Sequence, residues 1–148
     1  MNSSLFIFIL YLFFALYCTG SMMVLQIQHF ALYPLVGKES FKEYIKANNK
    51  AAFLPAIVPA ILLLITTIIL LFSRPAFMSL TTVISSLIMN LINITSTAIW
   101  QGKIHAQLEK VGHDEFLLKK LINTNWIRTL ALLVQGLIAT YCVFSALK

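Results

Sequence analysis

Four apolar runs, none containing an Asp, Glu, Lys or Arg, limit what this chain can fold into. They hold 19 to 25 residues each and cover residues 5–25, 51–72, 76–100 and 129–147. At about 1.5 Å rise per residue, roughly 20 helical residues cross a hydrocarbon core about 30 Å thick. Hydrophobic residues make up 59% of the 148 positions, more than a soluble fold of this length can bury. The runs predict an all-α integral membrane protein, a single domain (1–148) built as an antiparallel four-helix bundle.

The positive charges lie mainly in two of the connecting segments. The net charge is +6, and nine of the eleven basic residues are found there: Lys38, Lys42, Lys46, Lys50, Lys103, Lys110, Lys119, Lys120 and Arg128. The other side carries only Arg74 and Lys148. Cytoplasmic loops are enriched in Lys and Arg, so we expect both longer loops in the cytoplasm and both termini outside, in a bacterial inner membrane. The charge therefore predicts contact with the lipid bilayer, and no nucleic acid.

Prolines and polar segments divide the chain further. The first run lacks the basic segment of a signal peptide, so we expect a retained span. Pro34 is expected to end the first helix, and Pro75 to start the third. The segment Glu109–Leu121 is expected to be a short amphipathic helix. A weak repeat with an offset of 75 residues (Val36-Gly37 recurs as Val111-Gly112) favours two pseudo-symmetric helical hairpins.

Polar residues recur at helical spacing, which predicts one inward-facing stripe on each helix. The first two stripes are Thr19, Met22, Gln26, His29 and Tyr33, and Tyr44, Asn48, Ala52, Pro55 and Pro59. The third is Asn90, Asn93, Thr97, Gln101 and His105, and the fourth runs through Asn125, Arg128 or Thr129, Gln135 or Gly136, and Thr140. Their lysine-rich ends are the most polar, whereas the opposite half is nearly all aliphatic and aromatic. We therefore expect a pocket for a hydrophobic small molecule near the cytoplasmic leaflet.

The individual residues allow more than one interpretation. Asn and Thr side chains often serve only as hydrogen-bonding glue between helices. His29 and His105 are structural histidines, general acid/base residues, or axial ligands of a haem held between two imidazoles. No compact metal-ligand motif is present, so we expect neither a metal site nor an obligatory cofactor. Cys18 and Cys142 lie at different depths, which favours two free buried thiols. The spans hold no acidic residue, which disfavours a carboxylate-based proton pump.

The second half of the chain carries a family resemblance. The motif comprises an Asn-rich third helix from Asn90, a short polar link, Asn125-Trp126, Arg128-Thr129 and Gly136. The chain resembles the small four-helix membrane family of uncharacterised proteins that includes anthrone oxygenases. In the first half the likeness is one of layout only. The resemblance implies oxidation of a fused-ring phenol by molecular oxygen without an obvious cofactor.

Together these observations favour an oxidoreductase or oxygenase-like membrane protein acting on a hydrophobic aromatic or quinone-like compound. In this hypothesis the catalytic residues are His29, His105 and Arg128, which move a proton and support negative charge. The substrate-binding residues are Gln26, Tyr33, Asn48, Gln101, Asn125 and Trp126, of which Trp126 stacks on the ring. Two alternatives remain open: a non-enzymatic accessory or scaffold subunit of a membrane complex, and a bis-His haem carrier. The sequence names neither a substrate nor a protein partner.

Overall fold

The computed structural model describes residues 3–147, which fold into helices and connecting turns without a strand. Residues 1–2 and Lys148, which the charge count includes, lie outside this range. The first two long helices comprise α1 (Ser3–Val24), η1 (Leu25–His29), α2 (Phe30–Leu32) and η2 (Tyr33–Leu35), then α3 (Phe41–Ala51), η3 (Phe53–Ile57) and α4 (Val58–Phe72). The others comprise α5 (Leu80–Ser96), η4 (Thr97–Gln101) and α6 (Gly102–Val111), then α7 (Glu115–Ala146). The segments η1, η3 and η4 are π-helical, and η2 is a 3₁₀ turn.

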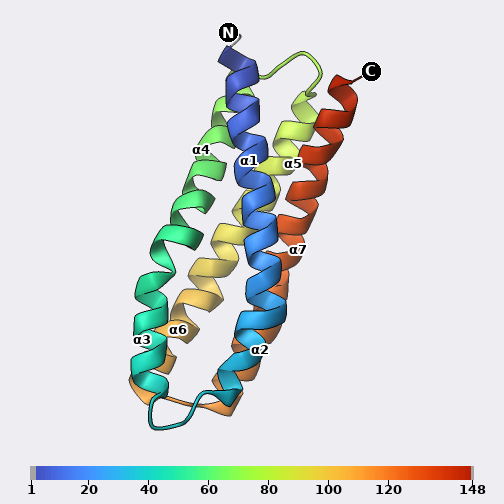
Figure 1. Ribbon diagram of the computed structural model, residues 1–148. Coiled ribbons are helices and arrows are strands. Elements are labelled where there is room, and N and C mark those ends of the chain that lie inside the picture. Colours follow the sequence, from blue (N-terminus) through green and yellow to red (C-terminus); the bar gives the residue numbers. More distant parts are fainter. Residues whose placement is uncertain (1–2, 148) are drawn as a thin grey trace.

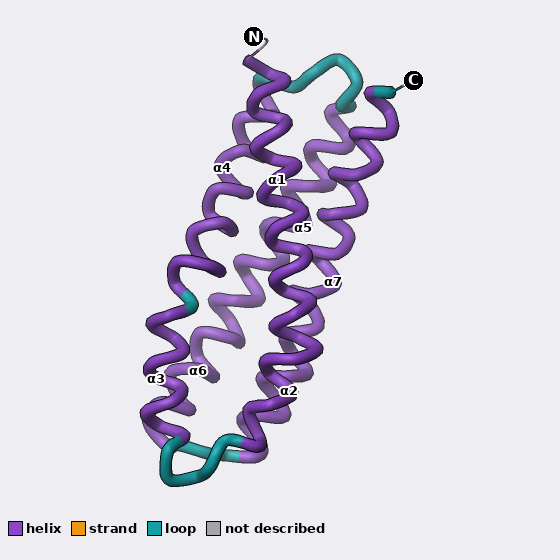
Figure 2. The backbone as a smooth tube through the Cα atoms, in the orientation of Figure 1, coloured by secondary structure: helices purple, strands orange, loops and turns teal. Residues whose placement is uncertain are grey.

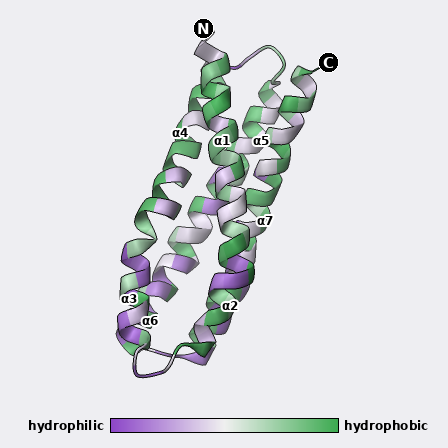
Figure 3. Cartoon of the chain, viewed as in Figure 1, coloured by the Kyte–Doolittle hydropathy of each residue, from purple (hydrophilic) through white to green (hydrophobic). Residues whose placement is uncertain are grey.

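Four helices in the described residues are long and apolar enough to cross a membrane: Ser3–Leu35, Phe53–Phe72, Leu80–Val111 and Glu115–Ala146. They lie side by side, with both termini at one end (Figure 1). The helix α1 packs against α4 and α7, and α5 packs against the same two helices. Hydrophobic residues dominate towards the termini, whereas hydrophilic residues gather around α3 and α6 (Figure 3). Large apolar side chains cover much of the outer surface, as expected for contact with lipid.

Several helix boundaries differ from the expected ones. The third long helix does not start at Pro75; it begins at Leu80, after Ser79, whose hydroxyl caps the helix by accepting a hydrogen bond from the Thr82 amide at 3.1 Å. The separate amphipathic helix over Glu109–Leu121 is also wrong. Helix α6 runs to Val111, and α7 starts at Glu115 after a turn that Gly112 makes at φ +90°. Local capping, and not the limits of the apolar runs, therefore sets these helix ends.

The expected end of the first helix agrees with the structure. Pro34 lies in the 3₁₀ turn η2, and Val36 after it has an extended backbone. In the second long helix, Ala52 makes a short break between α3 and η3, which is visible in Figure 2. The helix α3 packs against α6, so the chain on both sides of this break is held to the bundle.

Two clusters of buried apolar residues fill the interior. The terminal-half core lies towards the chain ends and comprises Phe8, Tyr11, Ala15, Cys18, Met22, Leu63, Leu70, Met78, Val83, Leu132, Ala139 and Cys142. The lysine-rich-half core comprises Phe30, Tyr33, Phe41, Ile45, Ile104, Leu108, Leu118 and Leu121. The two cysteines are free and buried. These clusters hold together the two ends of the bundle.

The terminal half is more polar inside than expected. Tyr11 Oη and Ser86 Oγ are hydrogen-bonded at 2.8 Å, and Gln135 Nε2 donates to Tyr11 Oη at 3.3 Å. Asn90 Nδ2 donates to Thr67 Oγ1 at 3.1 Å. The Oε1 atom of Gln135 is buried without a hydrogen-bond partner. The expectation of a nearly all-apolar half is therefore wrong, because these side chains link helices across the interior.

Candidate functional site

Three π-helical turns surround one cavity. The segments η1, η3 and η4 belong to three different long helices, and each contributes residues to its wall. A π turn holds one more residue than an α turn and occurs frequently at functional sites. In η3 the proline ring of Pro55 removes an N–H donor from the α-helical ladder. The regular helices are therefore interrupted where the polar stripes meet.

The cavity has a volume of about 340 Å³ and lies at the lysine-rich half of the bundle. All four long helices supply polar side chains to it. These are His29 from η1, Asn48 and Asn49 from α3, Thr97, Gln101, His105 and Glu109 from the third helix, and Arg128 from α7. Apolar residues such as Leu25, Phe30 and Ala56 complete the lining. The cavity is thus a mixed polar and apolar hollow inside a largely apolar protein.

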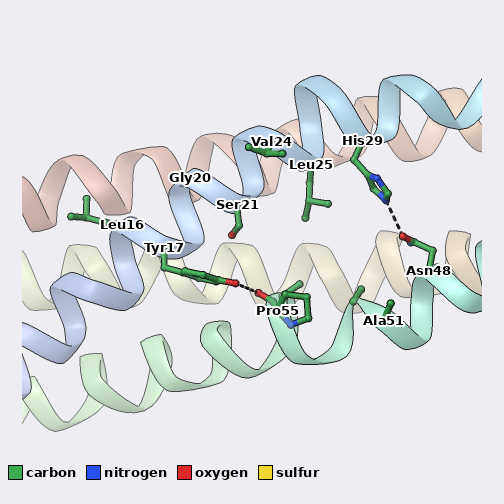
Figure 4. Close-up of a pocket in the computed structure, with 12 residues that line it drawn as sticks. Leu16, Tyr17, Gly20, Ser21, Val24, Leu25, His29, Asn48, Ala51 and Pro55 are labelled. Carbon is green, nitrogen blue, oxygen red and sulfur yellow. Dashed lines mark hydrogen bonds between the residues drawn. The ribbon is translucent and has the colours of Figure 1, made fainter.

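His29 lies in a small hydrogen-bonded group. Its Nε2 atom is 2.9 Å from Asn48 Oδ1, as Figure 4 shows. The Nδ2 atom of Asn48 donates to Tyr33 Oη at 2.7 Å, and Tyr33 Oη is 3.3 Å from His29 Nε2. An amide oxygen only accepts, so this arrangement assigns the proton to Nε2 and leaves Nδ1 as an acceptor. Nearby, partial burial raises the pKa of the Tyr44 hydroxyl above its ordinary value.

Two lining residues carry buried atoms that lack a partner. Gln101 is 1% exposed; its Nε2 atom donates to Thr124 Oγ1 at 2.9 Å, but its Oε1 atom accepts no hydrogen bond. His105 Nδ1 is likewise buried without a partner, and its ring lies 6.1 Å from that of Phe30. A buried polar atom without a hydrogen bond costs about 1–3 kcal/mol. A ligand in the cavity would recover this free energy once a side-chain movement brought these buried atoms within hydrogen-bond distance of it.

Arg128 brings a positive charge to the cavity wall. Its Nε atom donates to Asn93 Oδ1 and its Nη1 atom to Asn125 Oδ1, both at 3.2 Å. Both acceptors are neutral amides, and a guanidinium carries five N–H donors. Arg128 is half-buried, and a charge that has lost part of its water gains from an opposite charge or from further hydrogen bonds. The arrangement therefore favours a ligand with an anionic or electron-rich oxygen.

The structure places the other predicted site residues outside the cavity lining. Gln26 and Asn125 are buried and bonded to each other, with Asn125 Nδ2 donating to Gln26 Oε1 at 2.8 Å. Tyr33 is fully buried and touches the cavity only through His29 and Asn48. Trp126 is 42% exposed on the outside of the bundle. Five of the predicted site residues therefore line the cavity, namely His29, Asn48, Gln101, His105 and Arg128. The other four, Gln26, Tyr33, Asn125 and Trp126, do not.

A second hollow adjoins the cavity and was not expected from the sequence. This groove has a volume of about 640 Å³ and lies between α1 and the second long helix. Small residues make room for it, among them Gly20, Ala52 and Ala56. The sequence signal that could have predicted this groove is the set of small residues in the apolar helices. Such residues more often indicate close packing of two helices than a gap between them.

No relative is found: no family profile, no curated protein and no solved structure matches this chain. Within the part of the chain that the structure describes, no three His, Cys, Asp or Glu side chains are grouped as metal ligands. What the chain does is therefore inferred from the cavity itself.

The hydrogen-bonding side chains and the apolar wall of the cavity together fit one class of ligand. Gln101 Oε1 can accept a hydrogen bond from a hydroxyl group, and His105 Nδ1 can accept or donate one according to its tautomer. The Arg128 guanidinium can donate to a keto or phenolate oxygen. The apolar part of the wall, which includes Phe30 and Leu25, suits a ring. A ring compound with oxygen substituents would satisfy both sets of groups.

Proposed function

We propose that this chain is a multi-pass membrane protein whose cavity binds a hydrophobic ring compound with oxygen substituents. One observation carries the proposal: polar side chains from four long helices line the same hollow, and two of them present buried atoms without partners. Buried polar atoms are usually paired, because leaving one unpaired is costly. Here two such atoms belong to residues that line one hollow, whereas the unpaired Gln135 Oε1 of the terminal half does not line it. Unused hydrogen-bonding atoms on residues that line the hollow therefore support a binding site.

The proposal includes the arrangement in the membrane. The four long helices form an antiparallel bundle across the bacterial inner membrane, with the lysine-rich loops in the cytoplasm and both termini outside. In this orientation the cavity lies in the cytoplasmic leaflet, between helices whose outer surface is apolar. The ligand is then a compound that partitions into lipid.

The reaction that we propose is the oxidation of a phenolic or quinone-like ring. His29 or His105 takes a proton from the ring hydroxyl, and Asn48 and Gln101 orient its oxygen atoms. Arg128 stabilises the negative charge that develops on the oxygen. Molecular oxygen is the oxidant that the resemblance to anthrone oxygenases predicts, with no resident cofactor: one of its atoms enters the phenolic ring as a carbonyl oxygen, and the other leaves as water. Trp126 has no part in this proposal, because its ring lies on the exposed surface.

The scaffold alternative is supported by a different set of contacts. Gln26 with Asn125, Asn90 with Thr67, and Tyr11 with Ser86 are side-chain pairs that join helices. Such pairs are what a structural subunit needs. The bis-His haem carrier stays a prediction, and protein made with haem present would show a Soret band if it were right.

Mass spectrometry of small molecules that co-purify with the protein tests the proposal. The protein is extracted in mild detergent as wild type, as Gln101→Leu and as Trp126→Leu. We expect a ring compound in stoichiometric amount with the wild type and with Trp126→Leu. The Gln101→Leu variant should retain at least tenfold less, because its side chain offers no acceptor in the cavity. An equal yield from all three proteins, or a ligand-free stable wild type, would contradict the proposal.

A further inference from the structure

The groove between α1 and the second long helix is almost entirely apolar. Its walls include Leu16, Val24, Leu25 and Pro55, and the polar side chains that line it are Tyr17, Ser21, His29 and Asn48 (Figure 4). A Cβ atom built on Gly20 would meet nothing within 4 Å, so there is open space beside this residue. The groove faces the outside of a helix pair that is long and apolar enough to span a membrane. The groove therefore offers the apolar environment in which the acyl chain of a lipid lies.

Two hydrogen bonds between the helices frame this groove. At one end Tyr17 Oη donates to the carbonyl oxygen of Pro55 at 3.1 Å, and at the other His29 Nε2 meets Asn48 Oδ1 (Figure 4). The Pro55 carbonyl is available because Pro59, four residues later, has no N–H to donate to it. The twelve residue steps from Tyr17 to His29 rise about 18 Å along a helix. The groove is thus longer than one ring, and a hydrogen bond joins its two helices towards each end.

The groove and the polar cavity share a boundary. Five residues line both hollows: Leu25, His29, Asn48, Ala52 and Ala56. The His29–Asn48 hydrogen bond crosses this boundary, from the first long helix to the second. A molecule that occupied both hollows would have its apolar part on the lipid side of this bond. Its polar part would lie beside Gln101, His105 and Arg128.

We infer that the ligand is a tailed amphiphile, an oxygen-substituted ring with one long apolar chain, that reaches the cavity sideways from the bilayer through this groove. The inference rests on the proposed function and adds the tail and the route. The ring occupies the cavity and the chain lies along Gly20 and Val24. The His29–Asn48 bond opens for the ring to pass and closes over the junction of ring and chain.

Binding of two probes that differ only in the tail tests this inference. The probes are 2-hydroxy-1,4-naphthoquinone and its 3-decyl derivative, both radiolabelled, and the full chain is held in phospholipid nanodiscs. In Gly20→Trp the indole fills the open space beside residue 20, where the chain would lie. We expect Gly20→Trp to raise the Kd of the decyl probe at least tenfold and to leave the Kd of the tail-free probe within twofold of wild type.

A second variant and a control keep the result interpretable. Val24→Trp also narrows the groove, and Val24 is 56% exposed, so the larger side chain displaces no core residue. It should act like Gly20→Trp if that variant fails to fold. Ala98→Trp places the same ring on an exposed position of η4 and should change neither Kd.

The outcomes separate the two proposals. If both probes bind the wild type and neither Trp variant weakens the decyl probe, the tail and route are wrong while the cavity stands. If neither probe binds the wild type, the ring-binding cavity is wrong, and the tailed ligand is wrong with it. If the Trp variants weaken both probes equally, the groove does not hold a separate tail, and the inference fails.

Discussion

The two halves of the bundle use similar residues in different ways. In the terminal half, Tyr11, Ser86, Asn90 and Thr67 bond to one another across tightly packed helices. In the lysine-rich half, polar side chains such as Asn48 and Thr97 line a hollow of about 340 Å³. The helices are regular in the first case, and in the second they carry π turns and the break at Ala52.

The difference shows that polarity alone does not make a site in an apolar bundle. Asn, Thr and Ser close up the terminal half because regular helices bring them into register with partners. Where η1, η3 and η4 interrupt three of the helices, polar side chains line a shared hollow, and some of them, such as His29 and Asn48, also bond to each other. Polar residues where the helices are uninterrupted are therefore structural, whereas those beside the π turns are the candidate functional residues.

The largest expected effect is on the free energy of unfolding, and it comes from comparing two glycine substitutions. A Cβ atom on Gly136 would lie 2.7 Å from Thr19 Oγ1, at the close contact of α7 with α1, whereas one on Gly20 would meet nothing. Gly136→Leu should therefore destabilise the protein by about 3 kcal/mol through overpacking. Gly20→Leu should change stability by less than about 0.5 kcal/mol. Reversible unfolding in mixed micelles measures both, and equal losses would show that the groove is packed shut.

Replacing either of two amide side chains is expected to have an intermediate effect on the free energy of unfolding. Asn125 donates to Gln26 Oε1 and accepts from Arg128 Nη1, so Asn125→Leu leaves both partners without these bonds. We expect a loss of about 2 kcal/mol. Gln101→Leu removes a side chain whose oxygen is already unpaired and should cost less than about 1 kcal/mol. The same unfolding assay ranks the two, and the reverse order would mean that Gln101 is structural glue.

The smallest expected effect concerns the end of the groove. Tyr17→Phe removes the hydroxyl that donates to the Pro55 carbonyl and should cost about 0.6 kcal/mol, a typical value for interhelical hydrogen bonds in membranes. In a Pro59→Ala background the new N–H can bond that carbonyl within the helix, so Tyr17→Phe should then cost almost nothing. A double-mutant cycle measures the coupling, and zero coupling would separate Pro59 from this bond.

Helical periodicity predicted much of the candidate site. Spacings of three and four residues place His29, Asn48, Gln101, His105 and Arg128 on inward faces, and these five line the cavity. The same rule made Trp126 a weaker candidate, because it lies about 100° around the helix from Asn125, a residue of the inward stripe. Its aromatic character, and not its position, suggested the stacking role.

Periodicity could not decide which inward residues pair with each other. Gln26 and His29 belong to the same stripe, yet Gln26 bonds to Asn125 across a helix contact while His29 faces the hollow. That difference depends on the rotation and separation of neighbouring helices, which no single stripe encodes. The π turns were also beyond prediction, since η1 and η4 contain no proline to mark them.

The π turns fix the angular phase of the helix that follows each of them. One residue corresponds to about 100° of rotation, so the additional residue in η4 determines which side of α6 faces inwards. Deleting a single residue from Thr97–Gln101 would swing His105 and Glu109 out of the cavity wall while leaving the residues of α6 unchanged. The chemistry of this hollow therefore depends as much on residue count as on residue type.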